Sequence, residues 1–157
     1  AFNMTKLKPG DKAPNFNLQN QDGKKVKLGD FKGQKLLIYF YPRANTPGCT
    51  TQSCAVSEAR PTLKKKKMAA VGVSPDTPDK QLKFDEKFSL GFPLLCDTDF
   101  KVAKAYGAFG TKKSFGKVRE GIIRSSFLID EKGKIIDAWY KVKPNDTVPR
   151  ALEAAGG

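Results

Sequence analysis

The side chains best suited to chemistry are two thiols, Cys49 and Cys54, which lie five residues apart. A thiol reacts as its thiolate, and the unpaired N–H groups and positive dipole end of a helix start favour that anion. Thr46 and Pro47 predict such a start just before Cys49, since threonine caps a helix through its hydroxyl and proline suits the first helical position. Cys49 is therefore the candidate nucleophile, and Thr46 can donate a hydrogen bond to its sulfur or to an incoming oxygen. The alternative is a small, buried cysteine near a helix cap.

The spacing of Cys49 and Cys54 limits how they can react with each other. In an intact helix, side chains five residues apart differ by about 140° in direction and by about 7.5 Å in rise. Their Cα atoms would then be roughly 8 to 9 Å apart, beyond the limit of about 7 Å for a disulfide. A bond between them therefore requires the first turns to unwind, which predicts a switch between a helical reduced state and a locally unfolded oxidised state. The alternative is two unrelated helix cysteines.

The composition excludes several kinds of active site. The 157 residues include no histidine and three cysteines, which excludes Ser-His-Asp and Cys-His catalysis and the usual zinc sites. An odd cysteine count, with no stretch near the start that resembles a signal peptide, argues against a secreted disulfide scaffold. The longest apolar run, Leu36 to Tyr41, is too short to cross a bilayer. We expect a cytoplasmic protein; an organellar location after removal of a transit peptide, or a nuclear one, are the open alternatives.

The chain is strongly basic, with a net charge of +13 and one dense run, Lys64 to Lys67. Such charge favours acidic partners and can support weak binding to nucleic acid or anionic surfaces. The simpler interpretation of the lysine run is a solvated helical face, and a nuclear address is a weaker one. No zinc-finger spacing or RNA-binding signature accompanies the charge, so we expect no specific nucleic acid.

The apolar pattern predicts strands that alternate with helices, followed by a terminal hairpin and helix. Asp22-Gly23 predicts the turn of an N-terminal hairpin. Leu36 to Tyr41 predicts a strand buried on both faces, and the helix after it, from about Pro47 towards Lys67, must kink or restart at Pro61. Further strands are expected at 68–73, 92–95, 124–130 and 135–140. Further helices are expected from the end of a turn at 74–78 to about 88, over 100–106 and over 145–155. The segment 110–121 is expected to be a surface loop. This order predicts one α/β domain over residues 1–157, with a mixed central sheet flanked by helices, and a thioredoxin-like fold fits it.

One signature makes a resemblance specific. Pro42, Thr46 and Cys49 fit the Pro-x-x-x-Thr-x-x-Cys pattern of peroxiredoxins. The core Thr-Pro-Gly-Cys-Thr, with a second cysteine five positions on, resembles the bacterioferritin comigratory protein, or peroxiredoxin Q, subfamily. Asn45 and Gln52 depart from it, because acidic residues are common there, and Ala55-Val56-Ser57 departs from the usual Phe-Arg-Asp-like continuation. The resemblance extends over nearly the whole chain, through Pro9 to Phe16, Val71 to Ser74, Phe92 to Leu95 and Arg124 to Asp130.

The resemblance implies a thioredoxin fold and a thiol-dependent peroxidase with no metal or organic cofactor. Cys49 would attack a hydroperoxide and become a sulfenic acid, while Thr46 and Arg124 would activate the thiolate and stabilise the departing oxygen. Pro42 would shield the pocket from water. Cys54 would resolve the sulfenic acid into an intramolecular disulfide, and thioredoxin or a similar dithiol would reduce it. We expect a monomer with no membrane partner.

Four alternatives stay open. A dithiol oxidoreductase of the thioredoxin kind predicts a Cys-x-x-Cys motif, whereas Cys49 and Cys54 enclose four residues. A basic binding module for nucleic acid or chaperone clients would use the charge alone. Cys96 follows an apolar run and is expected to be a buried, inert cysteine, but it could also be a rival resolving thiol. Arg124, without the resemblance, would be interpreted as an exposed strand charge.

Overall fold

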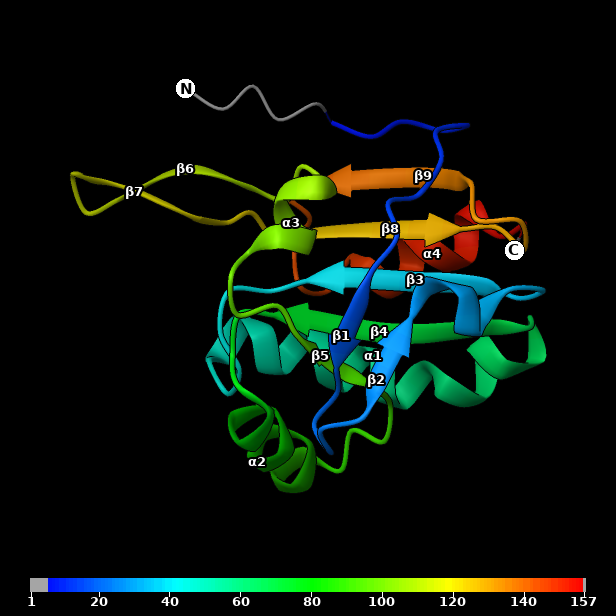
Figure 1. Cartoon of the computed structure of the whole chain (residues 1–157), viewed down its shortest axis with the longest axis horizontal. Coiled ribbons are helices and arrows are strands. Elements are labelled where there is room, and N and C mark those ends of the chain that lie inside the picture. Colours follow the sequence, from blue (N-terminus) through cyan, green and yellow to red (C-terminus); the bar gives the residue numbers. More distant parts are fainter. Residues whose placement is uncertain (1–5, 157) are drawn as a thin grey trace.

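The described part of the chain, residues 6–156 of a computed structural model, contains a mixed β-sheet of seven strands and a separate hairpin (Figure 1). The strands of the sheet follow the order β2-β1-β5-β4-β3-β8-β9. Strands β3, β4 and β5 run parallel to one another, and the remaining neighbours are antiparallel. The strands are β1 (Asn17–Gln19), β2 (Lys25–Lys27), β3 (Lys35–Phe40), β4 (Met68–Ser74), β5 (Leu94–Cys96), β8 (Ser125–Ile129) and β9 (Ile135–Tyr140). The helices are α1 (Pro47–Lys65), α2 (Pro78–Phe88), α3 (Lys101–Ala105) and α4 (Thr147–Ala154), with a 3-10 turn η1 (Leu28–Phe31).

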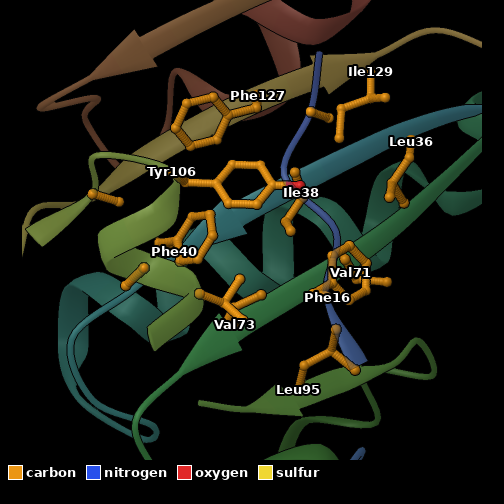
Figure 2. Packing of buried hydrophobic residues seen from close by; sticks show 14 of the residues in the cluster. Phe16, Leu36, Ile38, Phe40, Val71, Val73, Leu95, Tyr106, Phe127 and Ile129 are labelled. Atoms are coloured by element: carbon orange, nitrogen blue, oxygen red, sulfur yellow. The ribbon is translucent and has the colours of Figure 1, made fainter. Parts of the chain in front are cut away.

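Strand β3 is buried on both faces and divides the core into two layers. Phe40 points to one face and packs against Tyr106 of the chain after α3 and Phe127 of β8 (Figure 2). Tyr39 and Tyr41 point to the other face, into a cluster built with α1, α2 and α4. Alternate side chains of a strand point to opposite faces, so a strand covered on both sides is apolar throughout. This two-sided burial confirms the strand predicted from the run Leu36 to Tyr41.

Most predicted elements are confirmed, with strand ends shifted by one or two residues. Helix α1 is also confirmed, and it continues through Pro61 without the restart that was one of the two outcomes expected there. Proline lacks the N–H that would bond the carbonyl of Ser57. The Arg60 Nε donates to that carbonyl over 3.1 Å instead, so the acceptor has a partner and the helix continues.

The prediction of a surface loop over 110–121 is wrong. These residues form an antiparallel hairpin of β6 (Phe109–Ser114) and β7 (Lys117–Ile122), which projects from the body of the molecule (Figure 1). Both faces of most of this hairpin are exposed, so its sequence lacks the alternation of apolar and polar residues that marks a half-buried strand.

Within residues 6–156, no helix combines the length and the apolar composition needed to cross a membrane.

Candidate active site

The topology brings several chain segments to one edge of the sheet. Strand β3 ends at Phe40, and α1 begins at Pro47 after a short loop. Strand β8 runs antiparallel to β3 with Ser125 opposite Phe40, so Arg124, just before β8, lies beside the start of α1. Strand β9 pairs with β8 and ends at this edge, and α4 begins there at Thr147. Residues far apart in the sequence therefore meet around Cys49.

Cys49 and Arg124 form the centre of this site. The Cys49 side chain is completely buried in the first turn of α1, and the Arg124 Nη2 donates a hydrogen bond to its Sγ over 3.3 Å. A Cβ added to Gly48 would lie 3.2 Å from the same Nη2, so a glycine at this position lets the guanidinium approach the helix start. A fixed positive charge and the helix N-terminus therefore both face the sulfur.

A chain of hydrogen bonds holds Arg124 from behind. Its Nη1 donates to the Oε1 of Gln52 over 2.6 Å, and the Gln52 Nε2 donates to the Thr147 Oγ1 of α4 over 2.8 Å. The Thr147 and Ser126 hydroxyls are 3.0 Å apart and share a further hydrogen bond. Gln52, Ser126 and Thr147 are buried. In the sequence, Gln52 stood out only as a departure from the family pattern. Its position three residues after Cys49 nevertheless places both side chains on one helical face.

Thr46 occupies the N-cap position of α1, but its hydroxyl does not cap the helix. The Thr46 Oγ1 donates to the carbonyl of Arg43 over 2.8 Å, so the expected cap through this hydroxyl is wrong. The loop turns back at Asn45, which has a left-handed φ of 64°, and so brings that carbonyl within reach. In this reduced state the hydroxyl therefore bonds within its own loop, and its donation to the Cys49 sulfur or to a substrate oxygen stays a prediction.

The loop before α1 is anchored by a carboxylate that sequence analysis missed. The Ala44 N–H donates to the Oδ2 of Asp76 over 2.7 Å, and the Ser74 hydroxyl donates to the same oxygen over 2.7 Å. Ser74 ends β4, the strand beside β3, so the neighbouring strand holds the loop in place. Pro42 lies half-buried at the start of this loop, and the shielding role predicted for it stays a prediction.

The other two thiols differ in their surroundings. All three cysteines are free, and Cys54 is half-buried in α1. Burial raises the pKa of Cys54, and the negative charge of Glu58 one turn later raises it further. Cys96 is buried at the end of β5, as expected, and burial followed by the charges of Asp76 and Asp79 raises its pKa to about 11. A thiol that ionises so late is a poor nucleophile at neutral pH.

A buried hydroxyl pair fixes α1 to the sheet beside the two thiols. The Tyr39 and Ser53 hydroxyls lie 2.7 Å apart, and both side chains are fully buried. Burial raises the pKa of Tyr39 well above its ordinary value, so the phenol stays protonated. A Cβ on Gly72, the β4 residue paired with Tyr39, would lie 2.8 Å from the phenol oxygen, which explains why a glycine faces this ring.

A further cation, Lys112 of β6, is half-buried and is influenced by the residues of this site. Burial lowers the pKa of Lys112, the positive charge of Arg124 lowers it further, and Cys49 acts in the opposite direction. Lys112 therefore lies close enough to both residues for their charges to affect it. Sequence analysis missed this residue because it assigned the segment to a loop. Within residues 6–156, no three Cys, Asp or Glu side chains gather as a metal site would require.

The chain is similar to known proteins in both sequence and structure. Residues 9–138 match the AhpC/TSA family. Peroxiredoxin Bcp of Escherichia coli (strain K12) is 49% identical over 132 residues, which cover 84% of this chain and 85% of the relative. Peroxiredoxin Bcp of Bacillus subtilis is 44% identical over 144 residues, or 92% of each chain. Among solved structures, peroxiredoxin Q of Xanthomonas campestris matches with a TM-score of 0.84 at 34% identity and covers 89% of each chain.

A thioredoxin-like sheet that presents a buried cysteine at a helix start, beside an arginine, defines the thiol-dependent peroxidases as the class of this protein. The chain belongs to the AhpC/TSA family, as a peroxiredoxin of the Bcp, or peroxiredoxin Q, type. The resemblance drawn from Pro42, Thr46 and Cys49 and the predicted α/β fold are both confirmed.

Proposed function

We propose that the protein reduces hydrogen peroxide and organic hydroperoxides at Cys49, forms a Cys49–Cys54 disulfide, and is recycled by thioredoxin or a similar dithiol. The observation that carries this proposal is the hydrogen bond of 3.3 Å from the Arg124 Nη2 to the Cys49 Sγ at a buried helix start. The organic substrates have support from the bacterioferritin comigratory protein of Xanthomonas campestris, 33% identical to this chain, whose structures concern alkyl peroxide reduction.

In the first step, the Cys49 thiolate attacks the outer oxygen of the hydroperoxide. An S–O bond forms, the O–O bond breaks, and the alkoxide or hydroxide leaves with a proton from the solvent. Arg124 is placed to bond both the sulfur and the oxygen while negative charge moves between them, which is where a fixed donor lowers the barrier most. In the same proposal, Thr46 releases the Arg43 carbonyl to bond the substrate, and Pro42 limits the access of water.

In the second step, the Cys54 thiol loses its proton and attacks the Cys49 sulfenic sulfur. A disulfide forms, the S–O bond breaks, and the departing hydroxide takes up that proton and leaves as water. The raised pKa of Cys54 keeps this thiol protonated while α1 is intact, because burial and Glu58 both disfavour its anion. Unwinding of the first turns would remove the burial and bring the two sulfurs together. A dithiol then reduces the disulfide by thiol–disulfide exchange and restores both thiols.

Peroxide consumption in the presence of thioredoxin tests the assignment. Cys49→Ser should abolish turnover, because a serine hydroxyl stays protonated at neutral pH and has no base beside it. Cys54→Ser should permit a single oxidation of Cys49 but no cycling with thioredoxin. Cys96→Ser, the matched control, should keep full activity. Mass spectrometry of a non-reducing digest should find the Cys49–Cys54 peptide, and a dominant Cys49–Cys96 peptide would reassign the resolving role.

A further inference from the structure

The hairpin of β6 and β7 has one face that carries only positive charge among its charged residues. Lys112 pairs with Arg119 across the two strands, and paired residues share a face. Lys117, two residues before Arg119, lies on this face as well. Within residues 6–156, none of these three cations forms an ion pair. Like charges set opposite each other destabilise a hairpin, so folding alone does not account for this cationic face.

The tip of the hairpin exposes an aromatic side chain. Phe115 and Gly116 form its two-residue turn, with φ of 51° and 75°. A turn with positive φ at both positions favours asparagine and glycine, and a bulky residue there is strained. The Phe115 side chain is fully exposed and gains no packing in return. Aromatic residues and arginine are both enriched at surfaces that bind a partner.

The cationic face leads directly to the reactive thiol. Strand β7 continues through Ile123 into Arg124, so the base of the hairpin lies at the edge of the sheet where α1 begins (Figure 1). At this end of the face, Lys112 is half-buried and close enough to Cys49 and Arg124 to feel their charges. Arg119, directly opposite Lys112, and Lys117, nearer the tip, are exposed. A macromolecule bound along this face would reach over the site of oxidation.

We propose that the hairpin face of Lys112, Lys117 and Arg119, with Phe115 at its tip, docks the reducing partner, a dithiol protein whose surface around its own active site is acidic. This inference rests on the proposed function, because it assumes that a dithiol protein recycles Cys49. Charge complementarity identifies the partner as acidic, and the exposed Phe115 would contact an apolar patch on it. A second copy of the chain would bring a net charge of +13 to the same face and would be repelled.

A dithiol protein fits the face better than nucleic acid or an anionic membrane does. Nucleic acid and membranes require only the charge and the aromatic tip, and neither requires that the cations end at a redox-active thiol. The two faces of the hairpin also differ, since the opposite face combines the exposed Lys113 with Glu120 and the exposed, apolar Val118. A partner that binds one face alone explains this asymmetry, whereas a membrane approached by the tip would meet both faces.

The test compares two electron donors. In the double variant Lys117→Glu/Arg119→Glu, kcat/KM for an acidic thioredoxin should fall about tenfold or more, because charge reversal at a docking surface mainly slows association. Peroxidase activity driven by dithiothreitol, which needs no docking surface, should stay within about twofold of the unaltered protein. The control Lys132→Glu/Lys134→Glu makes the same charge change on exposed side chains of the turn between β8 and β9, at the opposite end of the sheet. It should leave both activities unchanged.

Three further measurements make the outcome decisive. Phe115→Ser should also lower kcat/KM for thioredoxin, and added salt should remove most of the difference between the charge variant and the unaltered protein. Equal losses in the hairpin variant and its control, or no loss in either, would overturn the docking proposal. So would binding of the hairpin to phosphatidylserine vesicles or to single-stranded DNA with unchanged thioredoxin kinetics.

The failure of docking can be told apart from failure of the proposed function. Absence of peroxide turnover with dithiothreitol in the unaltered protein would overturn the function itself. Docking then still has its own measurement, because protein oxidised chemically to the Cys49–Cys54 disulfide can be mixed with a thioredoxin that lacks its second active-site cysteine. The mixed disulfide should form about tenfold more slowly with the hairpin variant than with the control, and equal rates would refute the proposal.

Discussion

Replacing Gln52 by methionine removes the amide that holds Arg124 against the reactive thiol. Methionine is similar in length, but it can neither accept from the Arg124 Nη1 nor donate to Thr147. The variant therefore loses hydrogen bonds of 2.6 and 2.8 Å while the buried volume is nearly kept. The bond from the Arg124 Nη2 to Cys49 then has to orient the guanidinium without this second anchor.

The size of the effect follows from the kind of bond that is lost. A hydrogen bond to a charged group contributes about 1.5 to 3 kcal/mol. Arg124 is only half-buried, so water replaces part of the loss, and we expect a value near the lower limit, about 1.5 kcal/mol. If this loss falls on the transition state, oxidation slows about tenfold. The same loss of folding free energy lowers Tm by roughly 3 to 6 °C in a domain of this size.

Stopped-flow fluorescence of Trp139, the single tryptophan, can follow the oxidation, because Trp139 is paired with Ser126 just beyond Arg124. Gln52→Glu keeps an acceptor for the guanidinium and should restore the rate to within about threefold. Thr51→Val is the matched control, since this exposed neighbour only donates to the Pro47 carbonyl. Oxidation of Gln52→Met at the unaltered rate, or an equal loss in Thr51→Val, would refute the positioning role.

Three other outcomes follow from the site. Arg124→Ala should slow oxidation by roughly 30- to 900-fold with an unchanged circular dichroism spectrum, because it removes about 2 to 4 kcal/mol of charge stabilisation; an unchanged rate would make Arg124 a mere surface charge. Glu58→Gln should lower the pKa of Cys54 and so speed its alkylation by iodoacetamide at pH 8, since the lost negative charge opposed the thiolate; a slower reaction would contradict this sign. Hydrogen exchange should show protected amides over 50–57 in the reduced protein and not after disulfide formation, and equal protection in both states would exclude the unwinding.

The parts of the fold that could be predicted are those in which one local pattern decides. The run Leu36 to Tyr41 is apolar because β3 is covered on both faces, and Thr46-Pro47 marks the helix start by backbone preference alone. Arg124 is different, because it lies 75 residues from the cysteine that it contacts. No local sequence pattern can predict a contact between residues so far apart in the chain, and only the family resemblance indicated this one.

The parts that could not be predicted depend on partners supplied by the folded chain. The direction of the Thr46 hydroxyl follows from the nearby Arg43 carbonyl, which the left-handed backbone of Asn45 brings close. The continuity of α1 through Pro61 depends on the Arg60 side chain, which takes the place of the missing N–H. In each case the general preference of the residue type is correct, and a specific neighbour overrides it.

The kind of contact that holds α1 determines how far it can unwind. The buried side chains of its first two turns are Cys49, Gln52 and Ser53, which are small or polar. Ser53 is bonded to Tyr39 of β3, and Gln52 to the start of α4 and to Arg124. Water can replace each such bond, so the net contribution is only about 0.5 to 1.5 kcal/mol for each neutral pair and about 1.5 kcal/mol for the half-buried bond to Arg124.

The next buried side chain in α1 is Val56, followed by Leu63, and both belong to the apolar cluster under the sheet. Exposing them would remove apolar burial of about 1.5 to 3 kcal/mol each, and water offers no substitute for it. The proposed unwinding therefore has a natural limit just before Val56. The part of α1 that precedes Val56 contains both Cys49 and Cys54, so the two thiols can meet while the rest of α1 stays packed.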